Sequence, residues 1–189
     1  DDETLKVWDL ERGEAVRSLE GHTRVEAVAV TPDGRYAVSA SMRYTLKLWD
    51  LARGEEVCTL ECHESSWAIV NAVAVTMDGR HAVSAWADNT LKVWDLERGE
   101  ALLTLEGHTD HVDAVAVTRD GRHVVSGSSD KTLKVWDMVD GTLVASFGGE
   151  SPLFACAVAP DCRTIVAGHA GGVHILRLQG IWPPAEGVT

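Results

Sequence analysis

The sequence of 189 residues is poor in several features that point to particular protein classes. It has only two phenylalanines, two tyrosines, five prolines and four cysteines. No apolar run reaches the roughly 18 residues that a membrane-spanning helix needs. With 29 acidic against 17 basic residues, the formal net charge of -12 repels phosphate backbones and anionic lipid surfaces. We therefore expect neither a nucleic acid nor a membrane as a partner.

The four cysteines, at positions 58, 62, 156 and 162, lack the spacing of a disulfide framework. We interpret them as reduced thiols of a cytoplasmic protein, and the segment that begins at Asp1 has no apolar leader that indicates secretion. The side chains of Cys58, Cys62 and His63 are of the types that bind zinc. Because no further Cys or His pair lies nearby to complete four ligands, we predict no metal and no cofactor.

Seven tryptophans stand out against this background, and most of them mark an internal repeat. The segment 4–14 (TLKVWDLERGE) recurs letter for letter at 90–100 and in relaxed form at 45–55 and 132–142. Successive Trp-Asp pairs are 41, 45 and 42 residues apart, and Asp-Gly and Gly-His pairs repeat in step with them. The chain is therefore an array of similar units of about 42 residues.

Each unit is predicted to form four short strands. In one unit, β-branched and small residues alternate over 112–118, and Asp120-Gly121 supplies the positive φ angles of a tight hairpin turn. Further strands are expected at 122–128, 132–137 and 143–147. No segment has a sustained helical period, so we predict an all-β protein.

These motifs resemble those of the WD-repeat β-propeller family, from residue 2 to about residue 178. The resemblance implies a propeller of four-stranded antiparallel blades, with the strand before Asp-Gly innermost and the strand after Trp-Asp outermost. About four to five blades are expected here, in an incomplete ring. The array is also similar to the C-terminal part of some large bacterial signalling proteins, which suggests a larger signalling protein.

The first predicted unit, residues 1–20, is a partial blade that consists of a third and a fourth strand. Complete blades are predicted at 21–61, 62–106 and 107–148. Residues 149–178 form a degenerate terminal blade without its fourth strand, and residues 179–189 form a tail. This gives seventeen strands. The last blade lacks only a fourth strand, but the first partial blade supplies both a third and a fourth strand, so the two partial blades do not combine into one complete blade. Two interpretations stay open. Further blades belong to the same longer chain, or another subunit completes the ring.

A set of polar residues could be mistaken for a catalytic triad, namely His108, Ser126 and Asp130. In the resembled family these residues and Trp136 form a buried chain of hydrogen bonds. Because such sets recur from blade to blade without an oxyanion hole or pocket signature, we predict a structural role and no enzyme. The predicted tetrads consist of His22, Ser39 and Trp49; His63, Ser84, Asp88 and Trp94; and His108, Ser126, Asp130 and Trp136.

The repeats differ most in the loops that carry the tetrad His and Asp residues, which we call the His/Asp face. We predict that this face binds a protein or peptide, because Trp, Tyr, Met and Arg are enriched at interface anchors. The candidate anchors are Met42, Arg43, Tyr44, Trp67 and Trp86. Two alternatives stay open: the two tryptophans simply pack on each other, or the protein is a structural assembly module that completes a ring or oligomer through exposed strand edges.

Overall fold

The computed structural model describes residues 4–21, 24–41, 45–61 and 69–179, and in these residues it contains seventeen β-strands and no helix. The strands pair antiparallel in separate sheets of up to four strands. This confirms the predicted all-β fold built from four-stranded antiparallel blades. In the same residues there is no helix of the length and apolarity needed to cross a membrane.

Three sheets are complete, with their four strands paired in chain order. The first sheet contains β3 (Val25–Val30), β4 (Tyr36–Ser41), β5 (Thr45–Asp50) and β6 (Glu55–Glu61). The second sheet contains β7 (Val70–Val75), β8 (His81–Trp86), β9 (Leu91–Asp95) and β10 (Glu100–Leu105). The third sheet contains β11 (Val112–Val117), β12 (His123–Ser128), β13 (Thr132–Asp137) and β14 (Leu143–Gly148).

Two partial sheets flank the complete ones. The first partial sheet contains β1 (Thr4–Asp9) and β2 (Glu14–Glu20). The second contains β15 (Leu153–Val158), β16 (Thr164–His169) and β17 (Gly172–Arg177). By their repeat positions, β1 and β2 correspond to the third and fourth strands of a blade, and β15 to β17 correspond to the first three.

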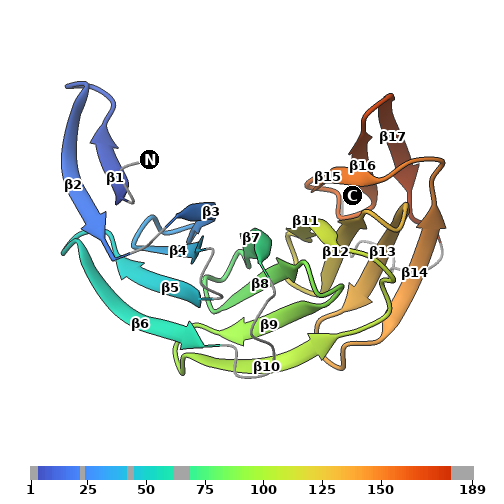
Figure 1. Cartoon of the computed structure of the whole chain (residues 1–189), viewed down its shortest axis with the longest axis horizontal. Helices are drawn as coiled ribbons and strands as arrows, with labels where there is room; N and C mark the ends of the chain where they lie inside the picture. Colours follow the sequence, from blue (N-terminus) through green and yellow to red (C-terminus); the bar gives the residue numbers. More distant parts are fainter. Residues whose placement is uncertain (1–3, 22–23, 42–44, 62–68, 180–189) are drawn as a thin grey trace, which may run out of the picture.

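The five sheets follow one another around an open arc (Figure 1). The first strands of successive sheets, β3, β7, β11 and β15, contact each other along the concave side. The fourth strands lie on the convex side, and β1 and β17 lie in opposite arms of the arc (Figure 1). The described strands therefore form an incomplete propeller rather than a closed ring.

The turn between the first and second strands of a sheet differs from the predicted tight hairpin. In the third sheet, Gly121 has a φ of 70°, whereas the φ of Asp120 is not positive. The turn extends from Thr118 to His123, and the Thr118 hydroxyl donates to Asp120 Oδ1 at 2.6 Å. The expectation of two left-handed residues was wrong, because a six-residue turn closed by side-chain hydrogen bonds needs only one.

The core lies between neighbouring sheets. We call the side of a sheet that packs on the following sheet its forward face, and the side that packs on the preceding sheet its backward face. At the contact of the first and second sheets, Val38 and Leu48 on the forward face share one apolar cluster with Trp94 on the backward face. At the next contact, Val83 and Val93 share a cluster with Trp136. Each blade is thus stabilised mainly by its neighbours, as expected for a repeat protein.

Candidate functional site

A chain of hydrogen bonds joins four residues of the third sheet that the sequence singled out. Trp136 in β13 donates its indole N–H to Ser126 Oγ in β12 at 2.9 Å, and Ser126 Oγ lies 2.7 Å from His108 Nε2. His108 Nδ1 lies 2.8 Å from Asp130 Oδ2. These hydrogen bonds therefore connect the loop before β11, which carries His108, to the turn between β12 and β13, which carries Asp130.

The carboxylate at the end of this chain determines where the protons lie. Asp130 can only accept, so His108 carries its proton on Nδ1 and accepts the Ser126 hydroxyl proton on Nε2. Burial lowers the pKa of His108, although Asp130 favours its charged form. Burial also disfavours charged Asp130, but hydrogen bonds from Thr132, Thr109 and His108 outweigh it and hold the pKa of Asp130 far below its usual range. A neutral imidazole beside a charged carboxylate satisfies every group of the chain.

The location of the His, Ser and Asp residues does not suit catalysis. The side chain of His108 has no solvent exposure, that of Asp130 is 3% exposed, and Ser126 is fully buried. A serine nucleophile must reach its substrate, whereas Ser126 lies between β13 and the His108 ring. These residues instead fix the register of strands and loops, the role that suits a fully paired buried network.

Parts of the same chain occur in the other complete sheets. Trp49 donates to Ser39 Oγ at 2.7 Å, and Trp94 donates to Ser84 Oγ at 2.8 Å. Asp88 accepts hydrogen bonds from the backbone N–H and the hydroxyl of Thr90. The predicted tetrad residues His22 and His63 lie outside the described residues.

Trp86 lies elsewhere than the sequence analysis expected. We predicted an exposed loop anchor, but Trp86 is the last residue of β8 and is 1% exposed. It shares an apolar cluster with Trp94, and its indole N–H donates to Ser84 Oγ at 2.6 Å. Side chains alternate between the two faces of a strand, so Trp86 points to the same face as Ser84 and is not available to a partner.

The remaining candidate anchors, Met42, Arg43, Tyr44 and Trp67, lie outside the described residues. They stay predictions. The degenerate terminal sheet has no tetrad, because Glu150, Ala167 and Leu176 occupy the places of His108, Ser126 and Trp136 in the repeat. A stacked pair of histidines, His169 and His174, with ring centroids 4.7 Å apart, is found in this sheet instead.

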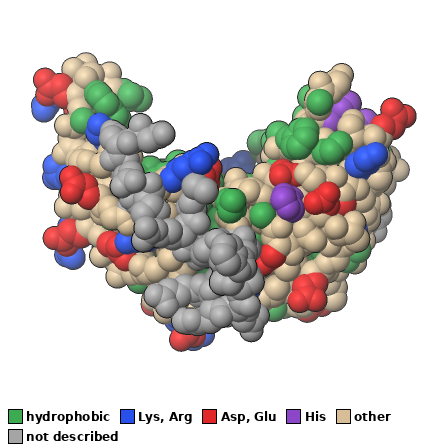
Figure 2. All heavy atoms as spheres, viewed as in Figure 1, with side chains coloured by type: hydrophobic (Ala, Val, Ile, Leu, Met, Phe, Trp, Pro, Cys, Tyr) green, Lys and Arg blue, Asp and Glu red, His purple; other side chains and the backbone are tan. Residues whose placement is uncertain are grey.

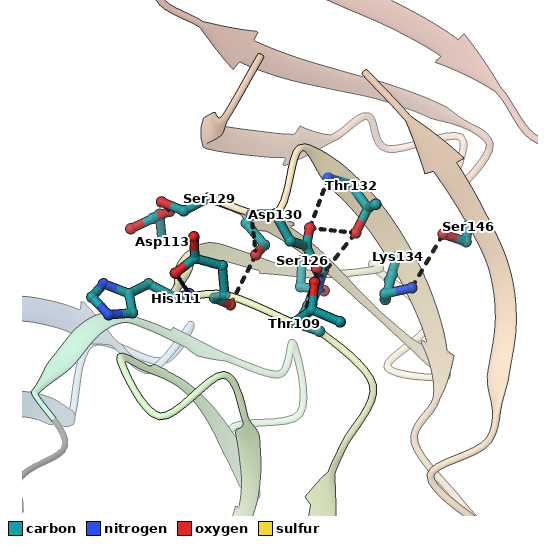
Figure 3. Close-up of polar contacts among 12 residues, drawn as sticks. Thr109, His111, Asp113, Ser126, Ser129, Asp130, Thr132, Lys134 and Ser146 are labelled. Atoms are coloured by element: carbon teal, nitrogen blue, oxygen red, sulfur yellow. Dashed lines mark hydrogen bonds and ion pairs between the residues drawn. The ribbon is translucent and has the colours of Figure 1, made fainter. Parts of the chain in front are cut away.

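Two loops of the third sheet hold each other in place on the His/Asp face (Figure 3). The backbone N–H of Ser129 donates to the His111 carbonyl at 2.9 Å, and the Ser129 hydroxyl donates to Asp113 Oδ2 at 2.7 Å. The Ser128 hydroxyl donates to the Asp110 carbonyl at 3.0 Å. Asp110 and His111 are nevertheless exposed, so these loops present polar side chains on a fixed backbone.

The threonines that complete the site were not predicted from the sequence. Thr132 donates both its N–H and its hydroxyl to Asp130 Oδ1, at 2.8 and 2.6 Å, and the Thr109 N–H donates to Asp130 Oδ2 at 3.0 Å. A signal for this was present, because an Asp is followed two positions later by a Thr in three units, at Asp2-Thr4, Asp88-Thr90 and Asp130-Thr132. That spacing is typical of an Asp side chain that bonds the backbone two residues on.

No group of three or more His, Cys, Asp or Glu residues suited to a metal ion occurs in the part of the chain that the structure describes. Cys58, Cys156 and Cys162 are free thiols. Burial raises the pKa of Cys156 to about 12, which keeps this thiol protonated and unreactive.

A cavity lies between the first two complete sheets, with a volume of about 270 Å³. It is lined by Tyr36, Leu48, Val57, Gly79, Arg80, Leu96 and Glu97. Gly79 and Leu96 belong to turns at the ends of the strands opposite the His/Asp face, so this cavity is separate from the loops described above.

Comparison with known families gives one match. The sequence model described as WD40, WD domain, G-beta repeat, matches residues 13–50, 54–95 and 99–137. Each matched segment begins just before the fourth strand of one sheet and ends with the third strand of the next, so every sequence repeat links two blades. A search of curated proteins found no match.

Proposed function

The chain belongs to the WD40 repeat family, whose repeats generally mediate protein–protein interaction or scaffolding. On this premise, we propose that the chain is a non-catalytic module that binds a protein or peptide through its His/Asp face. The observation that carries the proposal is the mutual bonding of two loops in the third sheet. Loops that are fixed before binding lose little conformational entropy when a partner arrives. The exposed side chains of Asp110 and His111 then form part of a ready-made binding surface.

The charge of this surface indicates the chemistry of its partner. Glu106, Asp110 and Glu150 are exposed in the loops of the His/Asp face, and Asp113 lies beside them, half-buried. Lys131 and Arg24 are exposed basic residues in the same set of loops, and the acidic residues outnumber them. The chain as a whole has a net charge of -12. A segment with positive charge and free hydrogen-bond donors complements such a surface and associates faster because of it. The proposed partner is therefore a basic or donor-rich peptide segment.

The binding test uses peptides selected from a displayed library on the immobilised protein. Isothermal titration then compares the wild type with Asp110→Lys/His111→Ala, which changes two exposed side chains of the His/Asp face. We expect the dissociation constant of the double variant to be at least tenfold higher, which corresponds to a loss of about 1.4 kcal/mol of binding free energy. The control Glu97→Lys, on the opposite face, should leave the dissociation constant unchanged. The proposal fails if the selected peptides bind the face variant as tightly as the wild type.

Trp67→Ala tests the candidate anchors that lie outside the described residues. If Trp67 is an anchor, its loss weakens binding of the same peptides without changing the unfolding curve. A changed unfolding curve with unchanged binding would instead support packing of Trp67 within the protein. Location in the cytoplasm also stays a proposal, and the free thiols of the described cysteines support it. A place in a signalling protein stays a proposal that rests on the resemblance of the repeat array.

A second candidate function, assembly through exposed strand edges, is supported by the pairing of the end strands. The third strands β5, β9 and β13 each pair on both sides, whereas β1 pairs only with β2, and β17 pairs only with β16, among the described strands. Unpaired edges are able to pair with another chain. Light scattering over a range of protein concentrations tests this function, which requires the mass to rise with concentration.

A further inference from the structure

The contacts between sheets inside the chain follow one rule. On the forward face of a sheet, three positions are apolar: one in the second strand and two in the third strand. A large side chain from the next sheet packs on these three positions, and it comes from near the end of that sheet's third strand. The three matched sets are Trp94 with Val38, Leu46 and Leu48; Trp136 with Val83, Leu91 and Val93; and Leu176 with Val125, Leu133 and Val135. Each of these three contacts thus pairs an aliphatic forward face with a bulky backward residue.

The forward face of the terminal sheet has the same aliphatic set without a cover. Val166 pairs with Ile175 as Val125 pairs with Val135, which makes these positions equivalent. Val125 and Val135 have no exposed surface, whereas Val166 is 36% exposed and Ile175 is 72% exposed. Val173, equivalent to the buried Leu133, is 64% exposed. This aliphatic patch, formed by Val166, Val173 and Ile175, is a forward face that no described residue of a neighbouring sheet covers.

The opposite end of the arc has the complementary deficiency. Trp8 in β1 opposes Ala15 in β2 as Trp94 opposes Ala101, so it occupies the position of the buried tryptophans. Trp94 and Trp136 are each 1% exposed, whereas Trp8 is 54% exposed. Among the residues that the structure describes, Trp8 is therefore a backward residue without a forward face to pack on.

The two unmatched halves cannot meet within one arc, since β1 and β17 lie in opposite arms (Figure 1). Figure 2 shows hydrophobic side chains on the sides of both arms that border the open part of the arc. We propose that copies of this chain associate head to tail, with Trp8 of one copy seated on the aliphatic patch Val166, Val173 and Ile175 of another. This contact between copies repeats the one that already joins neighbouring sheets within the chain.

This inference rests on the second candidate function, assembly, and does not depend on binding through the His/Asp face. It differs from edge pairing because the contact is between sheet faces rather than between backbone hydrogen-bonding groups. Because one surface binds a different surface, the contact is heterologous and either closes a ring or continues from copy to copy. A net charge of -12 on every copy opposes the association, so salt should strengthen it.

The test mixes two variants, each with one broken half. Trp8→Glu removes the backward residue, and Ile175→Glu places a charge in the aliphatic patch. Sedimentation velocity from about 1 μM to about 1 mM covers weak to moderate association. We expect the wild type to associate, each variant alone to stay monomeric, and an equal mixture to form pairs that do not grow, because one intact contact remains. Val139→Glu, a change at a turn residue with 82% exposure, is the matched control and should associate like the wild type.

The outcomes separate this proposal from the broader one. A monomeric wild type at the highest concentration overturns both the assembly function and the head-to-tail contact. Association that survives in both variants overturns the head-to-tail contact alone and leaves edge pairing. Loss of association in only one variant shows a contact between like ends, and loss in both variants without recovery in the mixture shows that Trp8 and the patch do not bind each other. Either result also overturns the proposal. Val173→Glu replaces Ile175→Glu if the latter does not give the unfolding curve of the wild type.

Discussion

The first three strands of the third sheet and of the terminal sheet share the same order and register, yet the two sheets differ in almost every side chain that ties a blade to its surroundings. The third sheet contains the chain from Trp136 to Asp130, and its forward face is covered by the next sheet. The terminal sheet has Leu176 and Ala167 instead, and its forward face is open. The comparison teaches that backbone topology survives loss of the tetrad as long as the apolar contact with one neighbour is kept.

The apolar contact therefore matters more for the blade than the hydrogen-bonded chain. Leu153, Ile165 and Ala167 of the terminal sheet are all fully buried against the third sheet. Burial of such aliphatic side chains contributes about 1.5–3 kcal/mol for each large residue. A neutral hydrogen bond contributes about 1 kcal/mol net and one to a charged group, such as that from His108 to Asp130, about 1.5–3 kcal/mol, yet the terminal sheet keeps its topology without either. Substitutions at equivalent positions of the two sheets test this ranking.

The largest difference is expected for a charge placed at equivalent forward positions. Val135→Asp buries a carboxylate without a partner between two sheets and should lower the free energy of unfolding by about 4 kcal/mol or more. Ile175→Asp, at the exposed equivalent, should change it by about 0.5 kcal/mol or less in dilute solution. Urea denaturation followed by circular dichroism measures both. Equal losses would show that the terminal forward face is covered within a single chain.

Removal of the bulky backward residue should have the next largest effect. Trp136→Ala deletes a buried indole and leaves Ser126 without its donor, for an expected loss of about 3–5 kcal/mol. Leu176→Ala removes a smaller, partly exposed side chain and should cost about 1 kcal/mol. The same denaturation experiment compares them. If the two losses are alike, the tetrad chain adds nothing to the contact between sheets.

Acid should weaken the third sheet through His108. Burial lowers the pKa of His108 in the folded protein, so as pH falls through about 6.5 the unfolded chain takes up a proton that the folded chain resists. The free energy of unfolding should therefore decrease from pH 7.5 to 5.5, by at most about 1.4 kcal/mol per pH unit for this group. His108→Gln should be less sensitive to pH over this range.

Only part of that sensitivity belongs to His108. Burial also lowers the pKa of His123, which adds a loss in the same direction that the variant retains. Asp130 has a lowered pKa, so the stability it provides is lost only in stronger acid, below about pH 4. An unchanged pH dependence in His108→Gln would contradict a neutral, buried imidazole.

The smallest effect is expected at the turn between the first two strands. Gly121 has a φ of 70° in the third sheet, and Cys162 takes the equivalent place in the terminal sheet with a φ of 56°. A side chain in this left-handed region costs about 1 kcal/mol, so Cys162→Gly should stabilise the protein by about 0.5 kcal/mol. Cys162→Ala, which keeps a Cβ, should not, and a stabilising effect of that variant would attribute the change to the thiol.

The fold was largely predictable because its determinants repeat. The period of about 42 residues, the Trp-Asp pairs and the alternation in 112–118 predicted the all-β blades and the incomplete ring. Trp86 was misjudged because its neighbours in sequence are loop residues. Ser41 and Ser128, which occupy the equivalent positions of the other two complete sheets, are small and fully buried. Side chains alternate along a strand, so Trp86, two residues after Ser84, could have been placed on the same buried face. The openness of Ile175 was not predictable from its own pattern, since exposure depends on which neighbour covers it.

The central claim is that inner and terminal sheets present the same forward face and that only the covering neighbour differs. Hydrogen–deuterium exchange measured at low and high protein concentration tests it most directly. We expect amides of β12 and β13 to exchange slowly at both concentrations, and amides of β1, β16 and β17 to gain protection only at high concentration. Protection of β16 and β17 that equals that of β12 and β13 in dilute solution, or that never changes with concentration, would contradict the account.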